Sequence, residues 1–249
     1  HHEEDAGKSL HDRVEAATAI DLNRAGVPLV EIVSEPDLRS PIEAAAYLGT
    51  LKGILDYARV SDVNMEQGSL RVDANVSARL RGETKLGTKT EIKNLNSFSA
   101  VERALAAEFA RQVTLLDRGE RVLQQTMLWD EVREVVRPSR AKEESHDYRY
   151  FPEPDLLPLV LDRAWIREIG DSIPELPPAR RERLIAEHGL PSDQIEDLIA
   201  VVARVEYFEA VARAHGDARA AANWVLGPVL AHLNATGTAL EDLRMRPAG

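Results

Sequence analysis

The chain has 249 residues, no cysteine and a formal net charge of −11, and 44% of its residues are hydrophobic. This length and composition suit one large or two smaller folded domains, and the lack of cysteine excludes disulfides, thiolate zinc sites and cysteine nucleophiles. The negative charge argues against a general nucleic-acid coat, and no apolar run approaches the ~20 residues of a membrane-spanning helix, so we expect a cytoplasmic protein without a membrane segment.

The first strong elements along the chain are a strand and a helix. Residues 27–34 are rich in β-branched side chains and lead into Glu35-Pro36-Asp37, which is typical of a strand followed by a turn. Ser40-Pro41-Ile42-Glu43 then supplies an N-cap, a first-turn proline and the glutamate of a capping box, and apolar residues recur at helical spacing up to Leu55. The sequence therefore predicts a helix from residue 40 onward.

Two neighbouring strands are predicted next. From residue 70 to residue 80 apolar side chains alternate with polar ones, as in a strand that buries one face. Asp73, Asn75 and Ser77 lie on the polar face. Glycines at 82 and 87 mark a turn, and residues 88–94 form a second strand in which Lys89, Glu91 and Lys93 share one side.

The rest of the chain changes from mixed to helical character. A capping box from Ser99 to Glu102 opens a long helix that stops near Gly119, and short strands are expected around 122–129 and 132–136. Proline-punctuated sequence follows, and beyond it helical spacing is interrupted at Gly189, Gly216 and Gly237. The predicted fold class is α+β, with a strand-rich domain over residues 1–162 and a small all-α helical domain over 163–249.

Several charged side chains on or beside the strands are candidates for a site. An ionised Glu31 within a β-branched strand costs several kcal/mol unless it is compensated, although an edge strand would let it point to water. Glu3, Glu4 and Asp5 beside Gly7-Lys8 suit Mg²⁺ near a phosphate, but acidic surface stretches are common and the spacing is not that of a P-loop.

The polar face of the predicted strands allows two interpretations. Asp73, Asn75 and Ser77 would present three polar groups to one cleft, or they would form the solvated side of an antiparallel sheet. Glu91 between Lys89 and Lys93 would likewise serve a site or form a cross-strand ion pair worth roughly 0–1 kcal/mol.

Six longer motifs are more specific than any periodicity, and they run in the order HHEEDAGK at 1–8, DLNR at 21–24, PLVEIVSEPD at 28–37, GSLRVDAN at 68–75, KNLNS at 93–97 and DYRYFPEPD at 147–155. They resemble the signature stretches of the GatB/GatE family of tRNA-dependent amidotransferases over nearly the whole chain. The resemblance implies a mixed-sheet cradle related to the glutamine synthetase fold, followed by a helical domain. It also implies that N-terminal cradle strands and a C-terminal tRNA-binding tail are absent from this sequence.

The resemblance further implies an activity and its site. The family is a carbon–nitrogen ligase that uses ATP and Mg²⁺ to convert the side-chain carboxylate of misacylated tRNA into an acyl phosphate, from which ammonia displaces phosphate. The family's motifs assign Glu4 and Glu31 as metal ligands, and Asp73 and Glu91 as catalytic residues of an acidic cleft. Lys8, Asn75 and Lys89 are assigned as phosphate or substrate contacts.

The same resemblance implies partners and leaves alternatives. The expected partners are the amidase of the complex, which supplies ammonia, the small third protein of the complex, misacylated tRNA and the cognate non-discriminating aminoacyl-tRNA synthetase. The archaeal relative GatE shares these motifs but carries an insertion for which this chain has no room, and a non-catalytic tRNA-docking scaffold is a second alternative. The sequence leaves open whether Asp-tRNA(Asn), Glu-tRNA(Gln) or both are substrates.

Overall fold

A computed structural model describes residues 1–10, 17–139 and 160–247 of the chain. The chain forms two compact units, His1–Ser40 and Pro41–Gly249, which we treat one at a time. The division predicted between residues 162 and 163 stays a prediction. Within the described residues, no helix is long and apolar enough to cross a membrane.

The first unit contains two antiparallel ribbons of short strands. β1 (His2–Glu4) pairs with β4 (Pro28–Val30), and β2 (Lys8–Leu10) pairs with β3 (Ala19–Asp21). The strand predicted over 27–34 is therefore shorter than expected. Backbone pairing ends at Glu31, which exchanges two hydrogen bonds with His1, and the side chain of Val33 is 71% exposed. A run of β-branched residues remains a strand only where a partner backbone pairs with it.

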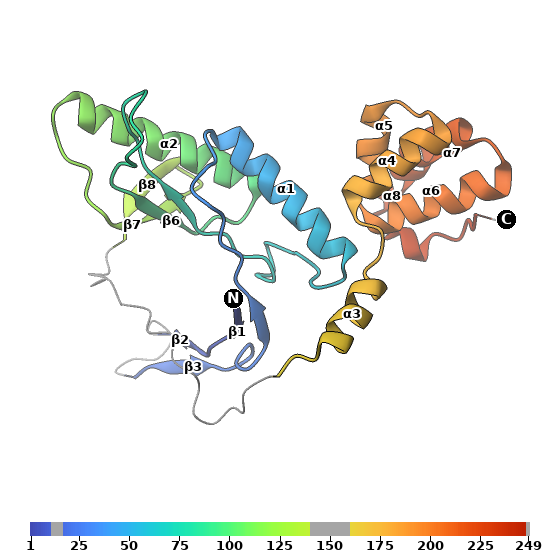
Figure 1. Cartoon of the computed structure of the whole chain (residues 1–249), viewed down its shortest axis with the longest axis horizontal. Helices are drawn as coiled ribbons and strands as arrows, with labels where there is room; N and C mark the ends of the chain where they lie inside the picture. Colours follow the sequence, from blue (N-terminus) through green and yellow to red (C-terminus); the bar gives the residue numbers. More distant parts are fainter. Residues whose placement is uncertain (11–16, 140–159, 248–249) are drawn as a thin grey trace. The chain divides into compact units, whose positions relative to one another are not determined.

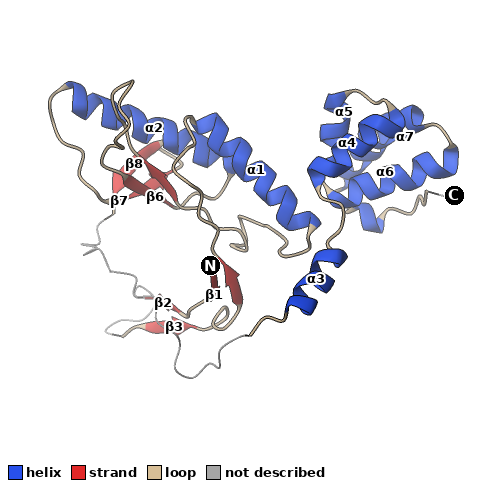
Figure 2. Cartoon of the chain, in the orientation of Figure 1, coloured by secondary structure: helices blue, strands red, loops and turns tan. Residues whose placement is uncertain are grey.

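The second unit begins with a mixed sheet and two helices (Figures 1 and 2). The sheet order is β5-β6-β7-β8, in which β6 and β7 are parallel and the two outer pairs are antiparallel. Two helices, α1 and α2, pack against each other, and α2 also contacts β5 and β8. The bounds of these elements are α1 (Pro41–Tyr57), β5 (Ala74–Val76), β6 (Thr90–Lys93), α2 (Phe98–Asp117), β7 (Thr126–Asp130) and β8 (Val135–Pro138).

Helix α2 starts earlier than the sequence predicts. Its N-cap is Ser97 rather than Ser99, and the Ser97 hydroxyl accepts a hydrogen bond from the backbone N–H of Ala100 at 3.0 Å. In this first turn Ala100 and Val101 pack against Ile92 of the sheet, and all three are buried. The prediction of Ser99 as the cap was therefore two residues late.

The connection between β5 and β6 depends on a close backbone approach at Gly87. A Cβ on Gly87 would lie only 2.0 Å from the carbonyl oxygen of Ala78.

The strand predicted over 70–80 is observed only as β5, and Leu80, expected on its buried side, is 73% exposed. The alternation itself is confirmed nearby, because Val72, Ala74 and Val76 pack against the core beneath α2.

The C-terminal part of the second unit is helical, as predicted. The predicted stops at Gly189, Gly216 and Gly237 are confirmed as left-handed C-caps. Leu184, Ile195, Leu198, Val205 and Phe208 belong to its buried core. The elements are α3 (Arg163–Ser172), α4 (Pro177–His188), α5 (Ser192–Ile199), α6 (Val202–His215), α7 (Ala218–Trp224), the π-helical turn η1 (Val225–Val229), α8 (Leu230–Thr236) and the 3₁₀ turn η2 (Leu240–Asp242).

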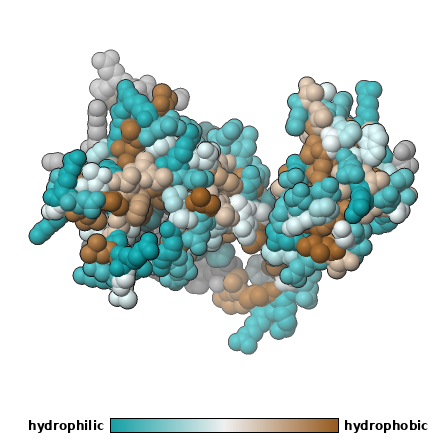
Figure 3. Space-filling view, turned by 90° about the horizontal axis from the view of Figure 1, so that it is seen from above, coloured by the Kyte–Doolittle hydropathy of each residue, from teal (hydrophilic) through white to brown (hydrophobic). Residues whose placement is uncertain are grey.

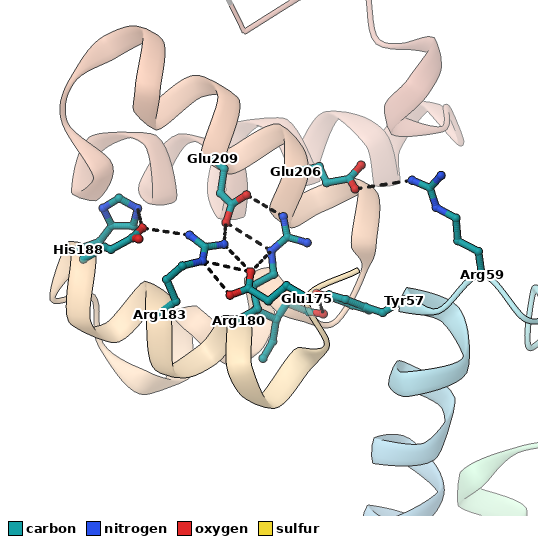
Figure 4. A network of polar contacts seen from close by, with 10 residues as sticks. Tyr57, Arg59, Glu175, Arg180, Arg183, His188, Glu206 and Glu209 are labelled. Carbon is teal, nitrogen blue, oxygen red and sulfur yellow. Dashed lines mark hydrogen bonds and ion pairs between the residues drawn. The ribbon is translucent and has the colours of Figure 1, made fainter. Parts of the chain in front are cut away.

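Tyr57, the last residue of α1, belongs to this helical core. Its ring is buried with Leu184 and Ile199, and its hydroxyl donates a hydrogen bond to the carbonyl oxygen of Ile199 at 2.7 Å. The guanidinium of Arg180 lies 5.7 Å from the centre of the ring and binds Glu209 at 2.7 Å (Figure 4). The Tyr57 side chain thus links the end of α1 to the helical region, and Arg59, two residues further on, lies 4.0 Å from Glu206 of α6.

Most of the surface in the space-filling view is hydrophilic, with separate apolar groups between the polar ones (Figure 3). Helix α3 contributes to the exposed apolar surface, since Trp165, Ile166 and Ile169 are each about half exposed, at 47%, 50% and 45%. No residue of α3 is buried.

Candidate functional site

The candidate site lies on the face of the sheet that points away from α2. Along β6, Thr90 and Ile92 are buried, whereas Glu91 and Lys93 alternate to the opposite face. Asn75 of β5 is paired with Glu91 in the antiparallel register, and Asp73 precedes Asn75 by two residues. We call Asp73, Asn75, Glu91 and Lys93 the polar face.

Lys93 joins the two carboxylates of the polar face. Its Nζ lies 3.5 Å from Oε2 of Glu91 and 3.7 Å from Oδ2 of Asp73. From the parallel neighbour β7, the hydroxyl of Thr126 donates a hydrogen bond to Oε2 of Glu91 at 3.1 Å. Two anions, one cation and one hydroxyl therefore converge on this part of the sheet.

The carboxyl of Asp73 holds its proton more strongly than an ordinary aspartate. Burial raises the pKa of Asp73 above its ordinary value of 3.8, the Lys93 ammonium lowers it in part, and the Glu91 carboxylate raises it again. The side chain is still 52% exposed, so water and substrate can reach it. A carboxyl with a raised pKa that is open to solvent is suited to accept a proton in a reaction.

Asn75 and Lys89 are the other two predicted site residues in the second unit. Both are exposed, and Lys89 lies one residue before β6. Within the described parts of the chain, the side chains of Asn75 and Lys89 make no hydrogen bond or ion pair with another residue. Their donors are thus able to bind a ligand without breaking a contact of the fold.

The remaining predicted residues, Glu4, Lys8 and Glu31, belong to the first unit. Glu4 is paired with Pro28 in the β1–β4 ribbon, and Lys8 is in β2. Glu31 is exposed and pairs through its backbone with His1. Because strand side chains alternate, Glu4 and Glu31 lie on opposite faces of this ribbon, and Glu3 lies on the face of Glu31.

This alternation bears on the expected metal site. Each of these carboxylates is a suitable oxygen ligand for Mg²⁺, and strand alternation puts Glu4 and Glu31 on opposite faces of the ribbon. In residues 1–10, 17–139 and 160–247 there is no group of three or more His, Asp or Glu side chains arranged to hold a metal ion. The assignment of both glutamates to one ion stays a prediction.

Lys93 and Thr126 were missing from the residues predicted for the site. Lys93 could have been found, because it lies two residues from Glu91 on the same strand face. Thr126 carried no such signal, since its contact with Glu91 follows from the parallel pairing of β6 with β7. The motif at 147–155 lies outside the described residues.

Comparison with known proteins gives close relatives of one kind. The chain is 49% identical over 250 residues to the B subunit of the aspartyl/glutamyl-tRNA(Asn/Gln) amidotransferase of Carboxydothermus hydrogenoformans, and 49% identical over 247 residues to that of Thermodesulfovibrio yellowstonii. It is 47% identical over 247 residues to that of a Thermoanaerobacter species. Each alignment covers 99% of this chain and 52% of the relative, so the chain spans about half the length of these proteins.

A family model agrees with these relatives. The model of the GatB/GatE catalytic domain matches residues 1–167, which include both strand-containing regions, the polar face and the first residues of α3. This match covers more than half of the chain, and it includes every residue predicted for the site. The chain therefore belongs to the GatB/GatE catalytic-domain family.

Proposed function

We propose that this chain is the catalytic part of the GatB protein of an ATP-dependent tRNA amidotransferase. Its reaction would convert aspartate on tRNA(Asn), glutamate on tRNA(Gln), or both into the corresponding amide. The observation that carries the proposal is the polar face, where Asp73 and Glu91 flank the ammonium of Lys93 in a domain of this family.

The chemical problem explains the need for ATP. A carboxylate resists attack by ammonia because its carbonyl carbon is electron-rich. A carboxylate oxygen of the substrate first attacks the terminal phosphorus of ATP, which forms an acyl phosphate and releases ADP. Ammonia then attacks the acyl carbon, the bond from this carbon to the phosphate oxygen breaks, and inorganic phosphate leaves as the nitrogen loses a proton.

The polar face supplies groups for both steps. Lys93 and Lys89 would neutralise charge on the transferred phosphoryl group, and the amide of Asn75 would donate to a substrate oxygen. Asp73, whose raised pKa favours proton acceptance, would take the proton that ammonia loses. Glu91 would hold Lys93 in place, since its carboxylate is fixed by Thr126 as well.

For the first unit, taken by itself, we propose residues that bind a metal ion and phosphate. Mg²⁺, when bound, neutralises phosphate charge and orients the oxygens of ATP. We propose Glu4 and Glu31 as its ligands, as the motifs shared with the family assign them. Lys8 in strand β2 is proposed as a phosphate contact.

Partners are needed for the nitrogen and for the substrate. Without cysteine and without an amidase segment, this chain is not expected to hydrolyse glutamine. Ammonia would come from the amidase of the complex, in an assembly that includes the small third protein. Misacylated tRNA and the cognate non-discriminating synthetase complete the proposed partners, and the assembly would act in the cytoplasm. We also propose that the strand-containing part of this chain forms a mixed-sheet cradle related to the glutamine synthetase fold.

The test replaces Glu91 by Gln in the full-length protein, assembled with its partners. Amide formation on each misacylated tRNA should fall by about 100-fold or more with either glutamine or added ammonia, because Lys93 loses the carboxylate that holds its ammonium in place to neutralise the phosphoryl group. Glutamine hydrolysis and tRNA binding should be retained. Glu120→Gln, at an exposed position after α2, is the matched control.

One result would favour the alternative function. If Glu91→Gln and Asp73→Asn both form Asn-tRNA or Gln-tRNA at rates near that of Glu120→Gln, the polar face is a solvated sheet surface. The chain would then act as a tRNA-docking scaffold, and the catalytic assignment of Asp73 and Glu91 would be wrong.

A further inference from the structure

A buried polar network lies directly behind the polar face. Thr90 of β6 and Glu108 and Gln112 of α2 all have 0% exposed surface. The same two elements also contribute Ile92, Val101 and Ala104 to a buried apolar cluster. Burying a carboxylate at such a position costs free energy unless the group is fully hydrogen-bonded. The hydrogen bonds of Glu108 therefore show which residues it fixes.

Both carboxylate oxygens of Glu108 accept hydrogen bonds. Its Oε1 accepts from the hydroxyl of Thr90 at 2.8 Å and from Nε2 of Gln112 at 3.1 Å. Arg111 binds both carboxylate oxygens, at 2.6 and 2.7 Å. Burial alone would raise the pKa of Glu108, but the hydrogen bonds from Arg111, Gln112 and Thr90 together lower it below the ordinary value. The carboxylate therefore stays ionised and holds Thr90.

Gln112 holds the end of the neighbouring strand β5. Its Oε1 accepts a hydrogen bond from the backbone N–H of Ala78 at 2.9 Å, and its Nε2 donates to the carbonyl oxygen of Val76 at 3.1 Å. The same nitrogen is 2.9 Å from the hydroxyl of Thr90. One amide side chain thus replaces the backbone partner that β5 lacks beyond Val76, and it joins β5, β6 and α2 at one point.

This joining point is adjacent to the residues of the polar face. Val76 pairs with Thr90 in the sheet register, and the next pair along is Asn75 with Glu91. A shift of Thr90 would move Glu91, and a shift of Val76 would move Asn75, because each is bonded to the next along the strand. Apolar residues of similar size would fill the same volume, so the polar bonds add a fixed position rather than bulk.

We propose that Thr90, Glu108 and Gln112 are positioning residues that hold β5 and β6 so that Asn75, Glu91 and Lys93 meet the substrate in reactive geometry. This inference rests on the proposed function, because it concerns the activation step at the polar face. A misplacement of about 1 Å can lower the rate of a positioned reaction by about 100-fold. The network should therefore affect the rate of the activation step more than the binding of tRNA.

The experiment compares two substitutions of Thr90 in the full-length protein, assembled with its partners and supplied with ammonia. Thr90→Val keeps the shape of the side chain but removes the hydroxyl that binds Glu108 and Gln112. Thr90→Ser keeps the hydroxyl and removes a methyl group. With Val, kcat for amide formation should fall at least about tenfold while KM for misacylated tRNA stays within about twofold, and Ser should retain kcat within about twofold.

A core variant separates positioning from loss of stability. Val101→Ala, in the same helix but outside the network, should lower the melting temperature without lowering kcat per folded molecule. If Thr90→Val does not fold, Gln112→Met takes its place with the same expected loss of kcat, since it keeps the length of the side chain but removes the bonds to Thr90, Val76 and Ala78.

The outcomes of this inference and of the proposed function are distinct. Equal kcat for the Val and Ser variants, or a loss with Val no larger than that of Val101→Ala, would overturn the positioning role while the wild-type enzyme remains active. Failure of the proposed function would appear instead as normal amide formation by both the Glu91→Gln and the Asp73→Asn variants, whatever the Thr90 variants do.

Discussion

The ammonium of Lys93 lowers the pKa of the Asp73 carboxyl, which lies beside it in the folded protein. This ammonium lies 3.7 Å from Asp73 and offsets part of the pKa increase that burial causes. In Lys93→Met, the pKa of Asp73 should rise further, because the burial and the Glu91 charge act without the compensating cation. NMR titration of the Asp73 carboxyl would measure this. Lys93→Arg, which keeps the positive charge, is the control, and an equal Asp73 pKa in the Met and Arg variants would contradict the assignment.

Glu108 makes stability depend on pH in the acid range. Its pKa in the folded protein lies below the ordinary 4.5, so its contribution to stability is present above pH 4.5 and is lost as pH falls through the folded-state pKa. Glu108→Gln should lower the free energy of unfolding by roughly 3–5 kcal/mol at neutral pH, since Arg111 loses its partner. The difference in unfolding free energy between wild type and Glu108→Gln should become smaller as the pH falls, because Glu108 is then protonated in the wild type as well.

Denaturant unfolding between about pH 3 and pH 7 would check this dependence. Asp117→Asn, at the exposed end of the same helix, serves as control and should leave the slope of stability against pH unchanged. If the difference between wild type and Glu108→Gln is the same at both ends of the pH range, Glu108 is not the titrating group.

At the scale of elements, the connection between β5 and β6 depends on one glycine. In Gly87→Ala, the new Cβ would lie 2.0 Å from the carbonyl oxygen of Ala78, so the backbone has to move. We expect a loss of about 1–3 kcal/mol in unfolding free energy, as for other overpacked sites. Gly49→Ala, in helix α1 with open space around its Cβ, should instead stabilise by about 0.5–1 kcal/mol. Calorimetric melting of both variants tests the contrast, and a Gly87 variant as stable as wild type would refute it.

At the scale of the whole molecule, Tyr57 joins α1 to the helical region. Burial raises the pKa of Tyr57 to about 12, so its hydroxyl remains a donor to Ile199 at ordinary pH. Tyr57→Phe leaves the Ile199 carbonyl oxygen without this donor and should lower stability by about 1–3 kcal/mol. Tyr47→Phe, elsewhere on α1, is the matched control.

Limited proteolysis provides a second measurement for this junction. Cleavage of the backbone next to Tyr57 and next to Ile199, the two sides of this contact, should become faster in Tyr57→Phe than in Tyr47→Phe, because local opening of the junction costs less. Identical cleavage rates would mean that other contacts, such as the ion pair of Arg59 with Glu206, hold the junction without the tyrosine hydroxyl.

Local features of the sequence were sufficient for many elements. The glycines at 189, 216 and 237 end helices because their left-handed conformation depends on the residue itself, and the alternation around Val72 to Val76 separates two strand faces wherever a sheet forms. The longer motifs similarly carried the family resemblance. Asp73 and Glu91 were predicted as one acidic site, and the structure places both beside Lys93.

Other features were decided only by tertiary structure. The parallel pairing of β6 with β7 puts Thr126 beside Glu91, and the packing of α2 buries Glu108 and Gln112 against Thr90. The opposite faces of Glu4 and Glu31 follow from the β1–β4 register. Sequence determined what each residue can do within its own helix or strand, whereas long-range pairing selected the partners, because register and burial depend on backbone segments that are distant along the chain.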